Sequence, residues 1–116
     1  MKLFIDDERP APSRWILAQD STTAIELLDL VADAGYQLEA VSLDFDLDGE
    51  DIIPVVEAMR DFDLWPREVY IHTANEDGED LLRKTIGALK PGLIRGYGCN
   101  YWGTGPDSVI RNEVNP

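Results

Sequence analysis

Three short apolar runs in the sequence each end in acidic or polar residues. Residues 3–5 lead into Asp6-Asp7-Glu8, residues 40–43 into Asp44, Asp46 and Asp48, and residues 69–71 into His72-Thr73-Ala74-Asn75. A buried strand of a parallel sheet is a continuous apolar run, and it becomes polar where it leaves the core. In open α/β sheets, ligands bind beyond the carboxyl ends of the strands. The pattern therefore predicts a parallel sheet in which three polar strand ends share one pocket.

The segments between these runs have the spacing of helices. Apolar residues recur with helical periodicity over residues 21–34 and 51–61, and again after a loop expected at residues 75–80. A short apolar run over residues 14–18 predicts one more strand, between the first strand and the first helix. Strands that alternate with helices indicate right-handed crossover units, which again predicts a parallel sheet.

The predicted fold is a flavodoxin-like three-layer α/β domain with strand order 2-1-3-4. This domain is expected to cover residues 1–91. Residues 92–116 are rich in glycine and aromatic residues and predict a C-terminal extension packed on the same domain. The extension either adds a short fifth strand or lies as a loop over the body. The predicted order makes the first and third strands neighbours, so Asp6 and Asp7 should lie beside Asp44.

The charge of the chain limits what it binds. Its 116 residues include 23 acidic and 10 basic side chains, which give a formal net charge of -13. Duplex nucleic acid requires clustered Lys and Arg, so an extended surface for it is not expected. This charge does not exclude a small phosphorylated ligand held through a metal ion. Cys99 is the single cysteine, and no apolar run has the roughly 18 residues of a membrane span. We therefore expect a cytoplasmic protein without a disulfide.

Asp6, Asp7 and Asp44 are the strongest candidates for a metal site, because two separate strands bring them to one edge of the sheet. Converging carboxylates repel one another, and a hard divalent cation is the usual means of neutralising them. Mg²⁺ or Mn²⁺ bound there would orient a phosphate group. The alternative interpretation is an acidic cluster of loop residues that faces the solvent.

Four further side chains each have two interpretations. Arg9 either binds a phosphate or pairs with a neighbouring carboxylate. Asn75 either orients a ligand or caps the following segment, and Thr73 either hydrogen-bonds a phosphoryl oxygen or is an ordinary strand-end hydroxyl. His72 is the sole histidine. It either transfers protons at the rim of the pocket or is a hydrogen-bonded core residue.

The motifs, taken in order, resemble those of a known family. They are Ile5-Asp6-Asp7-Glu8-Arg9-Pro10, Trp15, Ser42-Leu43-Asp44-Phe45-Asp46-Leu47 and Ile71-His72-Thr73-Ala74-Asn75. This order is similar to that of the cyclic-phosphate processing receiver domain, a divergent relative of response-regulator receivers, and the resemblance covers residues 2–90. Two positions depart from the pattern. Phe45 stands where the family has histidine, and Lys90-Pro91 follows a helical segment, whereas ordinary receivers carry Lys-Pro after a strand.

The resemblance implies a metal-dependent phosphoesterase that acts on a nucleotide or an RNA-end cyclic phosphate. Its catalytic residues would be His72 and Asp44, its phosphate-binding residues Arg9, Thr73 and Asn75, and its metal ligands Asp6, Asp7 and Asp44. The alternative is a receiver-like signalling or protein-binding module, in which Asp44 accepts a phosphoryl group or the site is inert. The missing family histidine favours this module, whereas the retained His72 and Asn75 favour the enzyme.

Overall fold

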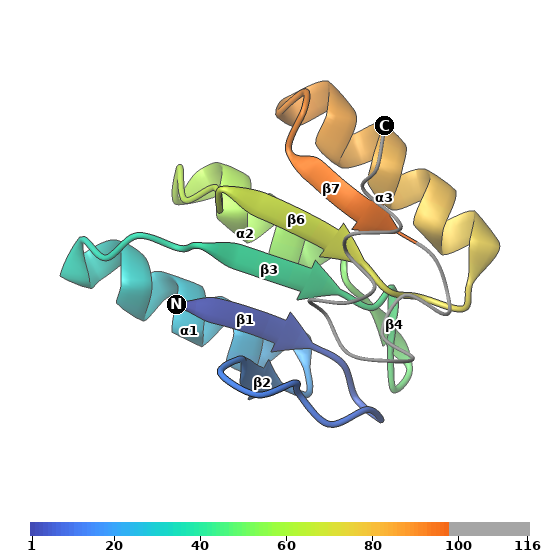
Figure 1. The fold of residues 1–116 in the computed structure, drawn as a ribbon, viewed down its shortest axis with the longest axis horizontal. Helices are drawn as coiled ribbons and strands as arrows, with labels where there is room; N and C mark the ends of the chain where they lie inside the picture. Colours follow the sequence, from blue (N-terminus) through green and yellow to red (C-terminus); the bar gives the residue numbers. More distant parts are fainter. Residues whose placement is uncertain (98–116) are drawn as a thin grey trace.

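The computed structural model describes residues 1–97, which form a five-stranded parallel sheet, three helices and a small antiparallel ribbon (Figure 1). In spatial order the strands of the sheet are β2 (Ile16–Ala18), β1 (Lys2–Ile5), β3 (Ala40–Leu43), β6 (Glu68–Ile71) and β7 (Ile94–Tyr97). The helices are α1 (Ser21–Ala34), α2 (Ile53–Asp61) and α3 (Glu76–Leu89), and the ribbon pairs β4 (Asp46–Leu47) with β5 (Glu50–Asp51). This arrangement confirms the predicted receiver-like parallel fold and its strand order.

The fifth strand at the edge of the sheet is β7, which pairs with β6. It lies within the segment that the sequence assigns to the C-terminal extension. The remaining residues of that segment, 98–116, are outside the described part of the chain, so the packing of the extension stays a prediction.

The central strands alternate their side chains between the two faces of the sheet. The odd-numbered positions of β1, β3 and β6 form one apolar core with the helices, through Leu3, Ile5, Val41, Leu43, Val69 and Ile71. Helix α1 packs against α2 and α2 against α3, which is consistent with a single layer of helices. Within residues 1–97 the three helices pack on one face of the sheet and none covers the other, so the third layer of the predicted fold does not occur among the described residues.

The other face of the sheet carries aromatic side chains. Phe4, on the central strand β1, meets the ring of Trp15 edge to face at 6.3 Å, and Trp15 meets Tyr70 in the same way at 6.4 Å. The imidazole of His72 stacks on Phe4 with 4.3 Å between the ring centroids. His72 is therefore packed among aromatic side chains, close to the end of the sheet that carries the polar residues.

Helix α3 begins earlier than the sequence predicts, so the loop expected at residues 75–80 is wrong. Asn75 is the N-cap, and its Oδ1 accepts a hydrogen bond from Gly78 N at 2.9 Å. Glu76, Asp77 and Glu79 occupy the first turn, where the helix dipole favours negative charge. Polar residues around a glycine are typical of a loop when read locally, but here they form a capped helix start.

Two other boundaries differ by two residues. Strand β2 begins at Ile16 instead of residue 14, because Arg14 has a left-handed φ of 73° and Trp15 N donates to Pro12 O at 3.1 Å, which makes a turn. Helix α2 begins at Ile53 instead of residue 51, because Asp51 pairs in β5. In the described part of the chain, no helix is both long and apolar enough to cross a membrane.

Candidate functional site

The polar strand ends meet because the hydrogen-bond ladders continue past the strands. Asp44 N donates to Ile5 O at 3.0 Å, and His72 N donates to Leu43 O at 2.9 Å. These bonds place the residues that follow β1, β3 and β6 side by side. In the sheet, β2 lies next to β1 in one direction and β3 lies next to β1 in the other. The point between β1 and β3 is therefore the switch point at which ligands bind in such sheets.

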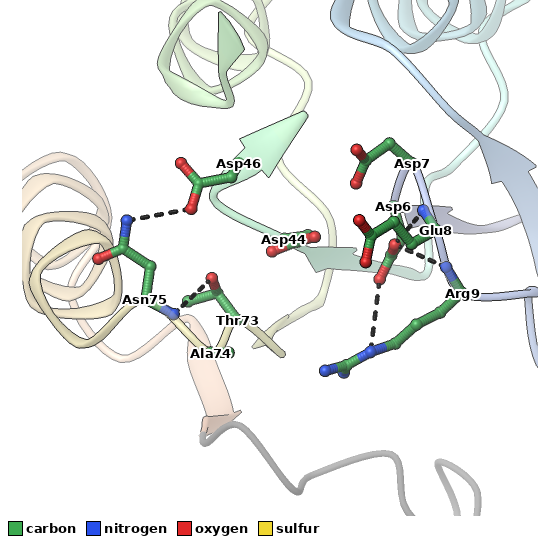
Figure 2. Close-up of a pocket in the computed structure, with 9 residues that line it drawn as sticks. All are labelled: Asp6, Asp7, Glu8, Arg9, Asp44, Asp46, Thr73, Ala74 and Asn75. Carbon is green, nitrogen blue, oxygen red and sulfur yellow. Dashed lines mark hydrogen bonds and ion pairs between the residues drawn. The ribbon is translucent and has the colours of Figure 1, made fainter. Parts of the chain in front are cut away.

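A pocket of about 230 Å³ opens at this edge (Figure 2). It is lined by Asp6, Asp7, Glu8, Arg9, Asp44, Asp46, Thr73, Ala74 and Asn75. One carboxylate oxygen from each of Asp6, Asp7 and Asp44 lies within 4.8 Å of the others. The structure thus brings together the three acidic residues and the three phosphate-binding candidates that the sequence singles out, but it leaves His72 outside the lining.

Asp6 is almost fully buried and remains an anion. Its Oδ1 accepts hydrogen bonds from Glu8 N and Arg9 N, both at 2.8 Å, and its Oδ2 lies 2.9 Å from His72 Nε2. Burial alone would raise the pKa of Asp6, but the hydrogen bonds from His72 and the two backbone amides outweigh burial and lower it. Asp6 is therefore a fixed negative charge at the base of the pocket.

Asp44 has the opposite electrostatic balance. Burial raises the pKa of Asp44, and the neighbouring negative charges of Asp6 and Asp7 raise it further. A hydrogen bond with the Thr73 hydroxyl lowers it, and the resulting pKa is about 6. Close carboxylates cannot all be ionised without a cost unless a cation balances them. The donor set fits a hard cation such as Mg²⁺ or Mn²⁺, which prefers oxygen ligands.

His72 is fully buried beneath the pocket, which agrees with its interpretation as a hydrogen-bonded core residue and not with a position at the rim. Its Nε2 lies 2.9 Å from Asp6 Oδ2, and its Nδ1 lies 2.6 Å from Ser42 Oγ. Burial lowers the pKa of His72 more than its hydrogen bond and charge interaction with Asp6 raise it, so the imidazole is neutral at pH 7. The ring contacts the pocket through Asp6 and not directly.

Arg9 and Asn75 lie at opposite ends of the pocket (Figure 2). The Arg9 guanidinium is partly exposed, with Nε 4.0 Å from Asp6 Oδ2 and Nη1 donating to His72 O at 3.4 Å. Asn75 serves as the helix cap described above and also donates from Nδ2 to Asp46 Oδ2 at 3.1 Å. Both side chains line the pocket and retain donors that a bound anion can use.

Phe45, which stands in place of the family histidine, packs against α3. A Cβ added at Gly78 would lie 2.8 Å from Phe45 Cβ and closer still to two ring atoms. The glycine is therefore required by the close approach of the aromatic ring. This contact fixes the segment between Asp44 and Asp46 against the first turn of the helix.

Gly78→Ala should destabilise the domain by about 1–2 kcal/mol, because overpacking outweighs the usual gain of alanine in a helix. Gly87 lies in the same helix with no atom within 4 Å of an added Cβ, so Gly87→Ala should stabilise by about 0.5–1 kcal/mol. Denaturant unfolding measures both. In a Phe45→Ala background, which removes the two ring atoms but keeps Cβ, Gly78→Ala should lose a large part of its penalty, and an unchanged penalty there would contradict the contact.

Sequence reasoning missed Ser42 as the partner of His72. The two residues are 30 positions apart, and the sequence offers no direct indication that they meet. A signal exists nevertheless: Ser42 is the one polar residue in the otherwise apolar run that forms β3, and a buried hydroxyl in a strand needs a hydrogen-bond partner.

One comparison with known proteins finds a match, and it covers the part of the chain that forms this site. The family model of the cyclic-phosphate processing receiver domain matches residues 1–88, which include all three polar strand ends. None of the curated proteins and none of the solved structures compared with the chain matches it. The family match spans well over half of the 116 residues. The chain therefore belongs to the cyclic-phosphate processing receiver domain family.

Proposed function

We propose that the domain binds Mg²⁺ or Mn²⁺ through Asp6, Asp7 and Asp44 and hydrolyses a phosphate ester of a nucleotide or an RNA-end cyclic phosphate. The observation that carries this proposal is the convergence of three carboxylate oxygens within 4.8 Å at the switch point of the sheet. The raised pKa of Asp44 supports it, because the cost of close negative charges is what a divalent cation would relieve.

In this proposal, the cation and the residues of the pocket each have a separate role in binding or hydrolysing the phosphate ester. The cation, when bound, supplies charge that polarises a phosphoryl oxygen. Arg9 binds the phosphate through its guanidinium, and Thr73 and Asn75 orient it by hydrogen bonds. Of the two candidate catalytic residues, Asp44 lines the pocket and His72 does not, so in this proposal a carboxylate of the pocket, and not His72, transfers the proton.

A hydrolysis assay with 2′,3′-cyclic and linear nucleotide phosphates tests the proposal. Turnover should depend on added Mg²⁺ or Mn²⁺ and cease with a chelator. Arg9→Gln should raise KM by about tenfold or more, because a hydrogen bond to a charged group is lost. Arg67→Gln is the matched control, since Arg67 is exposed and precedes β6, at the end of the strands opposite the pocket. Equal effects of the two substitutions would exclude Arg9 from the phosphate site.

A receiver-like module that binds a protein without chemistry is the second candidate. Phe45 favours it, because the ring packs on Gly78 and supplies no acid or base where the family has histidine. Cation binding without turnover on any of these phosphates would favour this module, whereas metal-dependent turnover would exclude it.

A further inference from the structure

We propose that Ser42 and His72 are positioning residues that orient the Asp6 carboxylate for cation binding from behind the pocket. This inference rests on the proposed metal site and assigns a role to two buried residues that do not line the pocket. Hydrogen bonds link Ser42 to His72 and His72 to Asp6, and the role of each residue follows from which atom donates and which accepts.

The hydrogen bonds fix the tautomer of His72. An ionised carboxylate only accepts hydrogen bonds, so Asp6 Oδ2 requires the proton to be on Nε2. A neutral imidazole then has an acceptor at Nδ1, and the Ser42 hydroxyl 2.6 Å away donates to it. Ser42 thereby holds the ring in the orientation and tautomer that serve Asp6.

The same bonds determine how Asp6 meets a cation. Its Oδ1 accepts two backbone amides, which use both lone pairs of that oxygen. Its Oδ2 accepts one hydrogen bond from His72, and Arg9 Nε lies 4.0 Å away, beyond hydrogen-bonding distance, so one lone pair of Oδ2 is left. Asp6 is therefore set to bind a cation through one lone pair of Oδ2, and His72 fixes the direction of that lone pair.

The surrounding structure supports a positioning role. Ser42 and His72 are both fully buried, and the His72 ring stacks on Phe4 at an interplanar angle of 12°. A buried hydroxyl and a buried imidazole cost stability unless they are hydrogen-bonded, which these two are. Partners behind a metal ligand typically change metal affinity by about 10–100-fold when they are removed.

The tautomer can be measured directly, because His72 is the sole histidine. In protein labelled with ¹⁵N-histidine, long-range ¹H–¹⁵N spectra without metal should show a protonated Nε2 and an unprotonated Nδ1. A proton on Nδ1, or an exchanging mixture of tautomers, would overturn the proposal. This readout does not depend on any activity.

Two variants of His72 then test the hydrogen bonds at Nε2 and Nδ1 separately. His72→Gln places an amide donor near the former Nε2 and can still serve Asp6, whereas His72→Asn places its amide near the former Nδ1 and cannot. Both lose the stacking on Phe4, so a purely structural role predicts equal effects. Mn²⁺ titrations should show near wild-type affinity for His72→Gln and a loss of about 10–100-fold for His72→Asn.

Ser42→Ala completes the test, with an expected loss of up to about tenfold in Mn²⁺ affinity. Unchanged affinity would remove Ser42 from the proposal, and equal affinities of the Gln and Asn variants would remove His72. Circular dichroism of each variant checks that it folds, and the wild-type tautomer decides the proposal if the variants do not. A wild type that binds neither Mn²⁺ nor Mg²⁺ would overturn the proposed metal site and the metal-orienting role, but it would leave the tautomer as measured.

Discussion

Asp44→Asn should melt at a higher temperature than the wild type in metal-free buffer at pH 7, and it should gain little from added Mg²⁺. The folded-state pKa of Asp44 is about 6, above the usual aspartate pKa of 3.8. A raised carboxyl pKa means that the folded state holds this proton more tightly, so stability falls as the pH rises from 3.8 to 6 and the cost is complete above that. The cost at pH 7 is at most about 3 kcal/mol.

Thermal melts at pH 7 and pH 4, each with and without Mg²⁺, give the comparison. The excess stability of Asp44→Asn should shrink at pH 4, where the wild-type carboxyl is almost fully protonated in the folded state and already close to half protonated in the unfolded state. Added Mg²⁺ should stabilise the wild type in proportion to the logarithm of its concentration and should leave the variant almost unchanged. Asp33→Asn, an exposed position on α1, is the control for removing one negative charge. A variant that melts below the wild type without metal, or responds equally to Mg²⁺, would contradict the carboxylate cluster as a cation site.

Cation affinity should rise with pH through the range in which Asp44 loses its proton. Metal ligands must be deprotonated, so binding to a carboxyl group with a pKa of about 6 releases one proton below that pH. The affinity should therefore fall by about tenfold for each unit of pH below 6 and become constant above 7. Asp6 adds nothing to this slope, because its pKa is lowered and it stays ionised.

Mn²⁺ titrations between pH 5 and pH 7.5 measure this dependence, and calorimetry in two buffers counts the released protons. In Asp44→Asn the affinity should be weak and nearly independent of pH. A wild-type affinity that does not change between pH 5 and pH 7 would mean that Asp44 is not a ligand or that its pKa is not raised.

The sequence predicts the sheet and the acidic part of the site because both depend on patterns within short segments. Apolar runs that end in carboxylates indicate strands whose ends share an edge, and the order of strands and helices places Asp6 beside Asp44. The structure confirms this topology and brings the three carboxylates together. Thr73 and Asn75 follow from the same reasoning, because they extend the run that forms β6.

The position of His72 is not predictable in the same way. The sequence indicates that this residue follows a strand, but whether its ring faces the pocket or the core depends on the alternation of the extended chain. His72 lies two residues after Tyr70, on the face that also carries Phe4, and the ring is consequently buried against that face. Its bond with Ser42 joins two strands and has no local signature.

Helix α3 illustrates the other limit. Asn75 to Asp80 has the composition of a loop, but the Asn75 cap and the contact of Gly78 with Phe45 make it the start of a helix. Gly78 is required by its contact with Phe45, 33 positions earlier in the chain, whereas the residues next to it in the sequence are typical of a loop. Tertiary contact therefore decides what local propensity leaves open.

The aligned registers of the three central strands have a consequence for insertions and deletions. Lys2 pairs with Ala40 and Ala40 with Glu68, so β1, β3 and β6 begin level and each reaches its polar end after four residues. One residue added within any of them would move its polar end by about 3.3 Å and exchange the faces of its side chains. Changes in length should therefore be tolerated in loops at the amino ends of these strands, such as residues 35–39 and 62–67, and should eliminate the site when they fall inside the strands.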